Sequence, residues 1–198
     1  MISIPNNSRR DQTRLRILNK ADELFHRLGF YKTTVADIAR ELEMSPANIY
    51  KSYASKEALV QAVADWNLSQ FKATIGEALK EGKTSSAKLK ILATTIYQFH
   101  KNKFRSDHEM YRLMVAAHDE QWLCVLEFKA FLRCTLTDII EEGIEAEEFS
   151  HLEASIEAEV LFDSLTWIIN PLLMFELKNA QVTKRIDAQI RFFERALT

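Results

Sequence analysis

Residues 34–53 read TVADIARELEMSPANIYKSY and contain the starts of two short helices. Thr34 is a typical N-cap residue, and Asp37, three positions later, fits a variant of the capping box in which two side chains satisfy free backbone N–H groups. Ser45 is a second N-cap type, and Pro46 follows it at the first helical position, where no N–H is needed. Two helix starts only eleven residues apart predict a helix-turn-helix.

The outer face of this helix pair is predicted to be free for a partner. Two helices this short cannot bury a core alone, so they must rest on a longer helix and leave one face free. Asn48 can form a bidentate pair with adenine in a major groove. The residues expected to face bases are Ser45, Pro46, Ala47, Asn48 and Lys51. The residues expected to donate hydrogen bonds to phosphates are Thr34, Tyr50, Tyr53 and Lys56.

The segment from about Thr13 to about Val63 resembles the DNA-binding domain of the TetR family of bacterial transcriptional regulators. The matching residues are Ile17, Ala21, Leu24, Phe25, Gly29, Thr33 to Val35, Ser45 to Tyr50, Tyr53, and Ser55 to Leu59. Two positions depart from the family pattern, since Glu43 and Ala47 stand where glycine is common, and Glu43 affects the geometry of the turn. The resemblance implies a DNA-binding domain at 1–56 and an effector-binding and dimerisation domain at 57–198.

The composition predicts an all-α fold. The chain has 198 residues, of which 47% are hydrophobic, and it contains only 4 Gly and 3 Pro. These are too few turn-forming residues for a many-stranded sheet, so we expect an all-helical protein. The apolar patterns and breaks along the chain indicate about nine helices. The N-terminus lacks the apolar segment of a secretory signal peptide, and no apolar run approaches membrane-spanning length. We therefore expect a cytoplasmic protein.

Charge is distributed unevenly along the chain. The net charge is −2, but residues 1–56 contain 10 Lys and Arg against 6 Asp and Glu, and the remainder contains 16 against 22. A basic head on an acidic body would direct phosphate attraction to one face of the molecule. The alternative is a chance asymmetry among solvated helix faces. The basic part coincides with the helix-turn-helix, which favours the functional interpretation.

The C-terminal third carries two strongly apolar helices, expected near 152–178 and 183–197. Pro171 should kink or split the first of them. The resemblance implies that both helices join those of a second copy in a four-helix bundle. The expected interface residues are Ile156, Val160, Ile168, Leu172, Ile186, Ile190, Phe193 and Leu197. The competing interpretation is that these side chains close the body of a single protomer.

Members of the family commonly bind an effector inside the body, which lowers their affinity for DNA. The corresponding region here contains Trp66, Tyr97, His100, Phe104, Met110, Met114, Trp122, Phe128 and Trp167. Apolar walls with a few polar groups are typical of ligand pockets, and also of an ordinary helical core. The expected ligand is a mostly apolar or aromatic organic compound.

No metal or cofactor is expected. His100, His108 and His118 are too widely spaced to share a helical turn, and Cys124 and Cys134 lack a metal-ligand spacing. An enzyme is disfavoured because no nucleophile–base pair or Gly-rich phosphate loop is present. The favoured function is a homodimeric repressor that binds a palindromic operator in double-stranded DNA and is released by an effector, with no membrane partner. The alternative is a DNA-bound scaffold of the same fold that acts through a protein partner.

Overall fold

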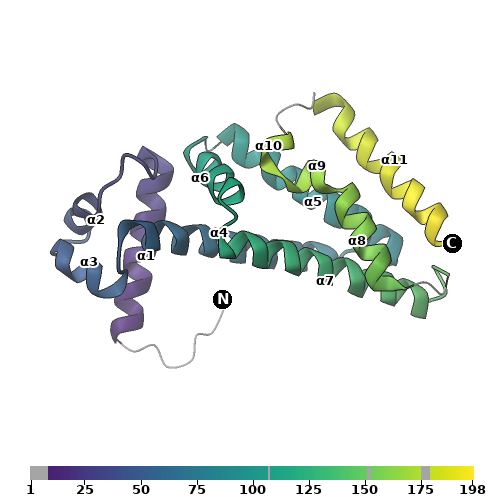
Figure 1. Cartoon of the computed structure of the whole chain (residues 1–198), viewed down its shortest axis with the longest axis horizontal. Coiled ribbons are helices and arrows are strands. Elements are labelled where there is room, and N and C mark those ends of the chain that lie inside the picture. Colours follow the sequence, from purple (N-terminus) through teal and green to yellow (C-terminus); the bar gives the residue numbers. More distant parts are fainter. Residues whose placement is uncertain (1–8, 107, 151–152, 175–178) are drawn as a thin grey trace.

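The computed structural model describes residues 9–106, 108–150, 153–174 and 179–198, and this part of the chain is entirely helical (Figure 1). The predicted fold class is confirmed, with eleven helices in the described residues instead of nine. The difference arises largely around Pro171, where the expected long helix is divided into α8 (Ala154–Ser164), α9 (Thr166–Ile169) and α10 (Pro171–Met174). Within the described ranges, no helix is both long and apolar enough to cross a membrane.

The first three helices form a head at one end of the molecule (Figure 1). They are α1 (Arg9–Leu28), α2 (Val35–Glu41) and α3 (Pro46–Ser52). The capping box is confirmed: Thr34 Oγ1 accepts from the Asp37 N–H at 3.1 Å, and Asp37 Oδ2 accepts from the Thr34 N–H at 3.0 Å. Pro46 is the first residue of α3, as predicted, although the Ser45 side chain makes no capping hydrogen bond. Glu43 has a φ of 54°, so a residue with a side chain occupies the left-handed region in the turn.

The long helix α4 (Lys56–Leu79) joins the head to the body. Ser55 caps it by accepting from the Ala58 N–H at 3.1 Å. The first half of α4 contributes Val63 to the head core, and the second half contributes Phe71 to the body core. The head core also includes residues of α6 (His108–Asp119) and α7 (Leu123–Glu145). The predicted domain boundary at residue 56 therefore crosses a continuous apolar cluster, and it stays a prediction.

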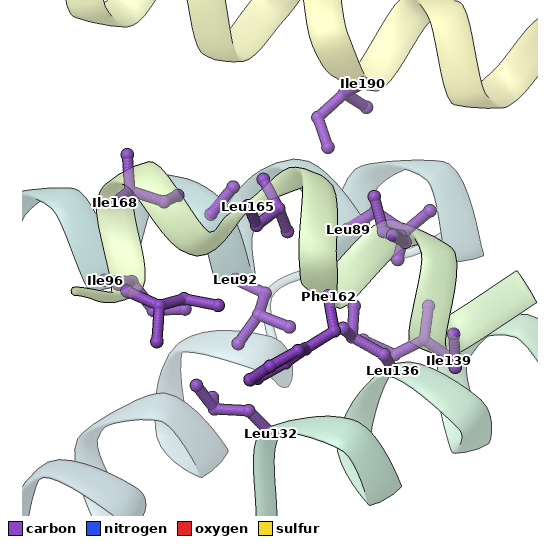
Figure 2. Close-up of a cluster of buried hydrophobic side chains, with 14 of the residues drawn as sticks. Leu89, Leu92, Ile96, Leu132, Leu136, Ile139, Phe162, Leu165, Ile168 and Ile190 are labelled. Atoms are coloured by element: carbon purple, nitrogen blue, oxygen red, sulfur yellow. The ribbon is translucent and has the colours of Figure 1, made fainter. Parts of the chain in front are cut away.

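The body core is formed by the second half of α4 with α5 (Ser85–Ser106), α7, α8, α9 and α11 (Asn179–Leu197). Figure 2 shows Ile190 pointing from α11 toward Leu165 and Leu89. Five of the residues expected at a dimer interface lie in this core, at most 7% exposed: Ile168, Ile186, Ile190, Phe193 and Leu197. Their side chains pack inside the body of one protomer, as in the competing interpretation, and the composition of the dimer interface stays a prediction.

The remaining three residues of that predicted set lie on the surface. Ile156 is 52% exposed, Val160 is 51% exposed and Leu172 is 41% exposed. Ile156 and Val160 are one helical turn apart on α8, and Phe192 on α11 is 69% exposed. Apolar side chains remain available for a partner on the outer side of α8 and α11.

Gly29 provides a test of how the head meets α6. It ends α1 with a φ of 89°, and a Cβ at this position would overlap the carboxylate of Glu109 on α6. We expect Gly29→Ala to lower the free energy of unfolding by about 1–2 kcal/mol, because the left-handed conformation is unfavourable for alanine. Gly76 lies within α4 with open space around it, so the matched change Gly76→Ala should stabilise the protein by about 0.5–1 kcal/mol. Urea unfolding of both variants measures the difference, and equal effects would contradict this account.

Candidate nucleic-acid interface and body cavity

The outer face of α3 is open to solvent. Ile49, 1% exposed, anchors the helix in the head core. The residues predicted to face bases are all exposed: Ser45, Pro46, Ala47, Asn48 and Lys51. Lys51 Nζ donates to Asn48 Oδ1 at 3.4 Å, so the amide is already oriented along this face. The structure brings the predicted base-facing residues together on one surface.

The predicted phosphate-facing residues differ in their surroundings. Thr34 and Tyr50 are exposed, and Lys56 Nζ donates to the Tyr31 carbonyl at 3.1 Å. Tyr53 is only 4% exposed, and its hydroxyl donates to the Arg14 carbonyl at 3.2 Å. Burial raises the pKa of Tyr53 above its ordinary value. To donate to a phosphate, Tyr53 would have to give up this hydrogen bond.

Arg14 on α1 secures the end of α3 and was not identified from the sequence. Its Nη1 donates to the Ser52 carbonyl at 2.8 Å, and its guanidinium lies 4.4 Å from the centre of the Tyr53 ring. Nothing in the spacing of residues 14 and 53 indicates this pairing, because it depends on how α1 crosses α3. The contact fixes the orientation of α3 relative to α1.

Thr34 and Asp37 form a second polar cluster at the start of α2. Thr34 Oγ1 donates to Asp37 Oδ2 at 2.7 Å, and Arg40 lies 2.7 Å from the other carboxylate oxygen. The hydrogen bonds from Thr34 are the main reason that the pKa of Asp37 is lowered. The cap keeps the start of α2 in place beside α3.

A cavity of about 50 Å³ lies where the head meets the body. Residues of α4, α5, α6, α7, α9 and α10 line it: Ala64, Asn67, Leu68, Phe71, Phe99, His100, Met110, Leu113, Met114, Ala117, His118, Val125, Phe128, Ile169 and Pro171. Four predicted pocket residues are among them, namely His100, Met110, Met114 and Phe128. Trp66, Tyr97, Trp122 and Trp167 do not line it, and the side chain of Phe104 lies outside the described part of the structure.

The tryptophans outside the cavity have other neighbours. Trp122 borders a separate groove beside Tyr31 and Lys56, and its Nε1 donates to Glu120 at 2.8 Å. Trp167 Nε1 donates to Gln189 Oε1 at 2.9 Å, which ties α9 to α11. These two rings support the packing of helices instead of forming the wall of the cavity.

Three polar side chains interrupt the apolar wall: Asn67, His100 and His118. Asn67 Nδ2 donates to Asp22 Oδ1 on α1 at 2.8 Å and to the Val63 carbonyl at 3.0 Å. This pair, which the sequence did not indicate, connects the cavity wall directly to the head.

His100 is 3% exposed, and neither ring nitrogen makes a hydrogen bond of normal geometry. Burial lowers its pKa to about 4, while the nearby backbone carbonyl of Ile169 opposes this shift and His118 adds to it. Burial is also the main cause that lowers the pKa of His118. His100 is therefore neutral at pH 7 and presents polar nitrogen atoms inside an apolar cavity. Among the described residues, no group of three or more His, Cys, Asp or Glu side chains is placed to hold a metal ion.

Two family models match this chain. The model for bacterial regulatory proteins of the tetR family matches residues 17–63, which contain the helix-turn-helix. The model for the tetracyclin repressor-like C-terminal domain matches residues 85–189, more than half of the chain. The protein belongs to the TetR family. Its α2 and α3 are accordingly the helix-turn-helix of a DNA-binding transcriptional regulator.

Individual TetR-like proteins show how far the similarity extends. The HTH-type transcriptional regulator UidR of Escherichia coli K12 is 43% identical over 51 residues, which is 26% of each chain. The match thus spans about a quarter of the length of the curated relatives. FadR from Bacillus subtilis, solved in complex with stearoyl-CoA, has a TM-score of 0.64 at 18% identity, with 93% of this chain and 99% of that chain covered. RolR, solved with its ligand resorcinol, has a TM-score of 0.63 at 16% identity, with coverages of 92% and 88%. At these identities the two structures show the fold alone.

Proposed function

We propose that this TetR-family regulator is a homodimeric repressor that is released from its operator by a small organic effector bound in the body cavity. The position of the cavity carries this proposal. Met110 and Leu113 on α6 belong to the head core and also line the cavity. On α4, Ala64 belongs to the head core and Phe71 to the body core, and both line the cavity. A molecule that fills this space presses directly on helices that hold the head.

The release mechanism is a shift between two conformations. An effector that binds more tightly to the conformer with the wrong spacing of recognition helices lowers DNA affinity. Displacing Met110 or Leu113 moves α6, and Gly29 of the head packs against Glu109 on the same helix. The Asn67–Asp22 hydrogen bond provides a second connection, between α4 and α1. A coupling of about 1–3 kcal/mol between the sites would change operator affinity roughly 5–150-fold.

Base contacts are assigned to Pro46, Ala47 and Asn48 at the exposed start of α3. We expect Asn48→Ala to relax the base preference at one position of each half-site by about 1–3 kcal/mol, because an amide–adenine pair is lost. Selection of bound sequences from a random duplex library measures this. Gln98→Ala, an exposed change on α5 away from the head, is the control and should leave the motif unchanged. An unchanged motif for Asn48→Ala would remove Asn48 from the base-contacting set.

The two structural relatives with named ligands do not decide the effector, because stearoyl-CoA and resorcinol differ greatly in size and charge. The size of this cavity supports the second candidate function, a scaffold without an effector. Its volume of about 50 Å³ is roughly one third of the engineered cavity of about 150 Å³ that binds benzene. Ligand binding here requires the flexible side chains of Met110 and Met114 to move.

A two-step experiment separates the two functions. A thermal-shift screen of small organic compounds finds those that stabilise the folded protein by mass action. Fluorescence anisotropy with the selected operator then measures whether each compound releases the DNA. If the protein is a repressor released by an effector, at least one compound should raise its melting temperature and lower its affinity for the operator. If compounds stabilise the protein and none changes operator affinity, the scaffold function is favoured.

A further inference from the structure

His100 is a buried side chain whose polarity the surrounding protein leaves unsatisfied. It is 97% buried on α5, it lines the cavity, and neither Nδ1 nor Nε2 makes a hydrogen bond of normal geometry. Leaving a buried polar group unpaired lowers the stability of the folded protein, because the group has lost its hydrogen bonds to water. An apolar residue of similar shape would pack here without that cost. An unpaired histidine in this wall therefore indicates a role in recognising something that enters the cavity.

The surroundings of the ring decide which kind of hydrogen bond it can offer. The backbone carbonyl of Ile169 is near enough to favour a protonated ring nitrogen on its side. A carbonyl can only accept, so its position favours the tautomer with the hydrogen on the nitrogen that faces it. The other nitrogen of a neutral imidazole is then an acceptor. The group that satisfies it must be a donor, such as a hydroxyl.

The rest of the wall limits the charge of the ligand. The described lining contains no Asp, Glu, Lys or Arg side chain, and its only other polar members are Asn67 and His118. Burying a carboxylate or an ammonium group here would be strongly unfavourable, because the described lining offers no partner of opposite charge. An uncharged ligand avoids this cost.

Aromatic rings form one side of the cavity. Phe71 and Phe99 are stacked with ring centres 3.6 Å apart, and Phe71 and Phe128 lie 5.3 Å apart. All three line the cavity, and His100 meets Phe99 edge-on with centres 5.7 Å apart. Offset-stacked and edge-on arrangements are favourable between aromatic groups. A planar ring placed beside these side chains would bring a hydroxyl substituent to His100.

We propose that His100 accepts a hydrogen bond from the hydroxyl group of a small, uncharged aromatic compound bound in the cavity. This inference rests on the proposed effector function and names the chemical class of the effector. Met110 and Met114 supply the adjustable part of the wall, which sets the upper size of the ring system.

Four probes of similar size test the proposal on the full-length protein in the absence of DNA. Phenol has a ring and a donor, anisole has a ring and an acceptor only, toluene has neither, and benzoate carries a charge. Calorimetric titration should show phenol binding about 10-fold more tightly than anisole or toluene, the upper range for one neutral hydrogen bond. Benzoate should bind more weakly than phenol. Nitrogen resonances of the His100 ring should shift on addition of phenol and not of toluene.

Two matched variants identify the residue that makes the hydrogen bond. His100→Leu should bind phenol and toluene equally, and it should remain folded because it removes an unpaired buried group. His118→Leu changes the other histidine of the wall and should keep the preference for phenol. If His118→Leu loses the preference and His100→Leu retains it, the assignment of His100 is overturned.

The remaining outcomes separate this inference from the proposed function. Equal binding of phenol and toluene, tighter binding of benzoate, or no binding of any probe at millimolar concentration overturns the ligand class. Operator affinity measured on the same samples tests the effector role. If phenol binds as expected and operator affinity is unchanged, the ligand class stands and the effector function fails. If benzoate binds and releases the operator, the effector function stands and the ligand class fails.

Discussion

Replacing Ile156 and Val160 together with aspartate is expected to give a folded monomer that binds operator DNA about 100-fold or more weakly. Both side chains are half exposed on α8, so charges at these positions cost the isolated protomer little. In the proposed dimer the same two positions become buried, where unpaired carboxylates are strongly unfavourable. A monomer can occupy only one half-site at a time, so it loses the binding free energy of the second half-site. Each 1.4 kcal/mol of lost binding free energy weakens affinity tenfold, so a 100-fold loss corresponds to about 2.8 kcal/mol.

Sedimentation gives the mass of this variant, and fluorescence anisotropy gives its affinity for the operator. Leu126→Asp is the matched control, since Leu126 is a 45% exposed apolar residue near the start of α7. It should leave the protein dimeric. Ile190→Asp should instead prevent folding, because Ile190 is 2% exposed within the protomer. A dimeric Ile156→Asp, Val160→Asp variant with normal operator affinity would show that another surface forms the dimer.

Acidification is expected to destabilise the protein between about pH 6.5 and pH 4 through His100. Its pKa is lowered to about 4 in the folded protein by burial, against an ordinary value near 6.5. The unfolded chain therefore binds more protons in this window, and stability falls as pH falls through it. Above pH 6.5 the residue is neutral in both states and contributes no pH dependence. Complete protonation of His100 in the folded protein would lower the free energy of unfolding by on the order of 3 kcal/mol.

Urea unfolding at pH 7 and pH 5 measures this effect. His100→Leu should lose much less stability between the two values than the natural protein. Part of this slope, meaning the change in the free energy of unfolding with pH, should remain in His100→Leu. Burial also lowers the pKa of His118, so that histidine contributes in the same direction. His108→Gln, an exposed change at the start of α6, is the control and should leave the slope unchanged. An equal slope in the natural protein and in His100→Leu would contradict the burial of a neutral imidazole.

The local structure of the head was predictable from the sequence because its signals act over a few residues. Thr34 and Asp37 are neighbours on one helical turn, so their capping box follows from spacing alone. Gly29 adopts the positive φ that is common just after the end of a helix. In the body, Pro171 likewise begins a new helix because it cannot continue the previous one. Each of these features is set by residues that are close in sequence, and none depends on which other helix packs against it.

The partner of an apolar helix face was not predictable in the same way. The spacing of Ile186 and Ile190 shows that α11 has an apolar seam, and burial stabilises such a seam equally against its own protomer or a second copy. In the structure α11 packs on α5 of the same chain. The lining of the cavity raises the same difficulty, because Phe71 and Phe99 line it while Trp66 does not. Helix periodicity identifies a buried side chain but not which side chains border an empty space.

The most direct test of the account is selection of bound sequences by the purified protein from a random duplex library at two salt concentrations. Phosphate contacts make affinity fall with salt, whereas base contacts keep the preferred sequence unchanged. We predict enrichment of a palindromic motif whose half-sites are separated by about one helical turn, as expected for two recognition helices of a dimer. If no sequence is enriched and binding simply disappears at the higher salt concentration, the protein is not a dimeric, sequence-specific regulator of the kind proposed here.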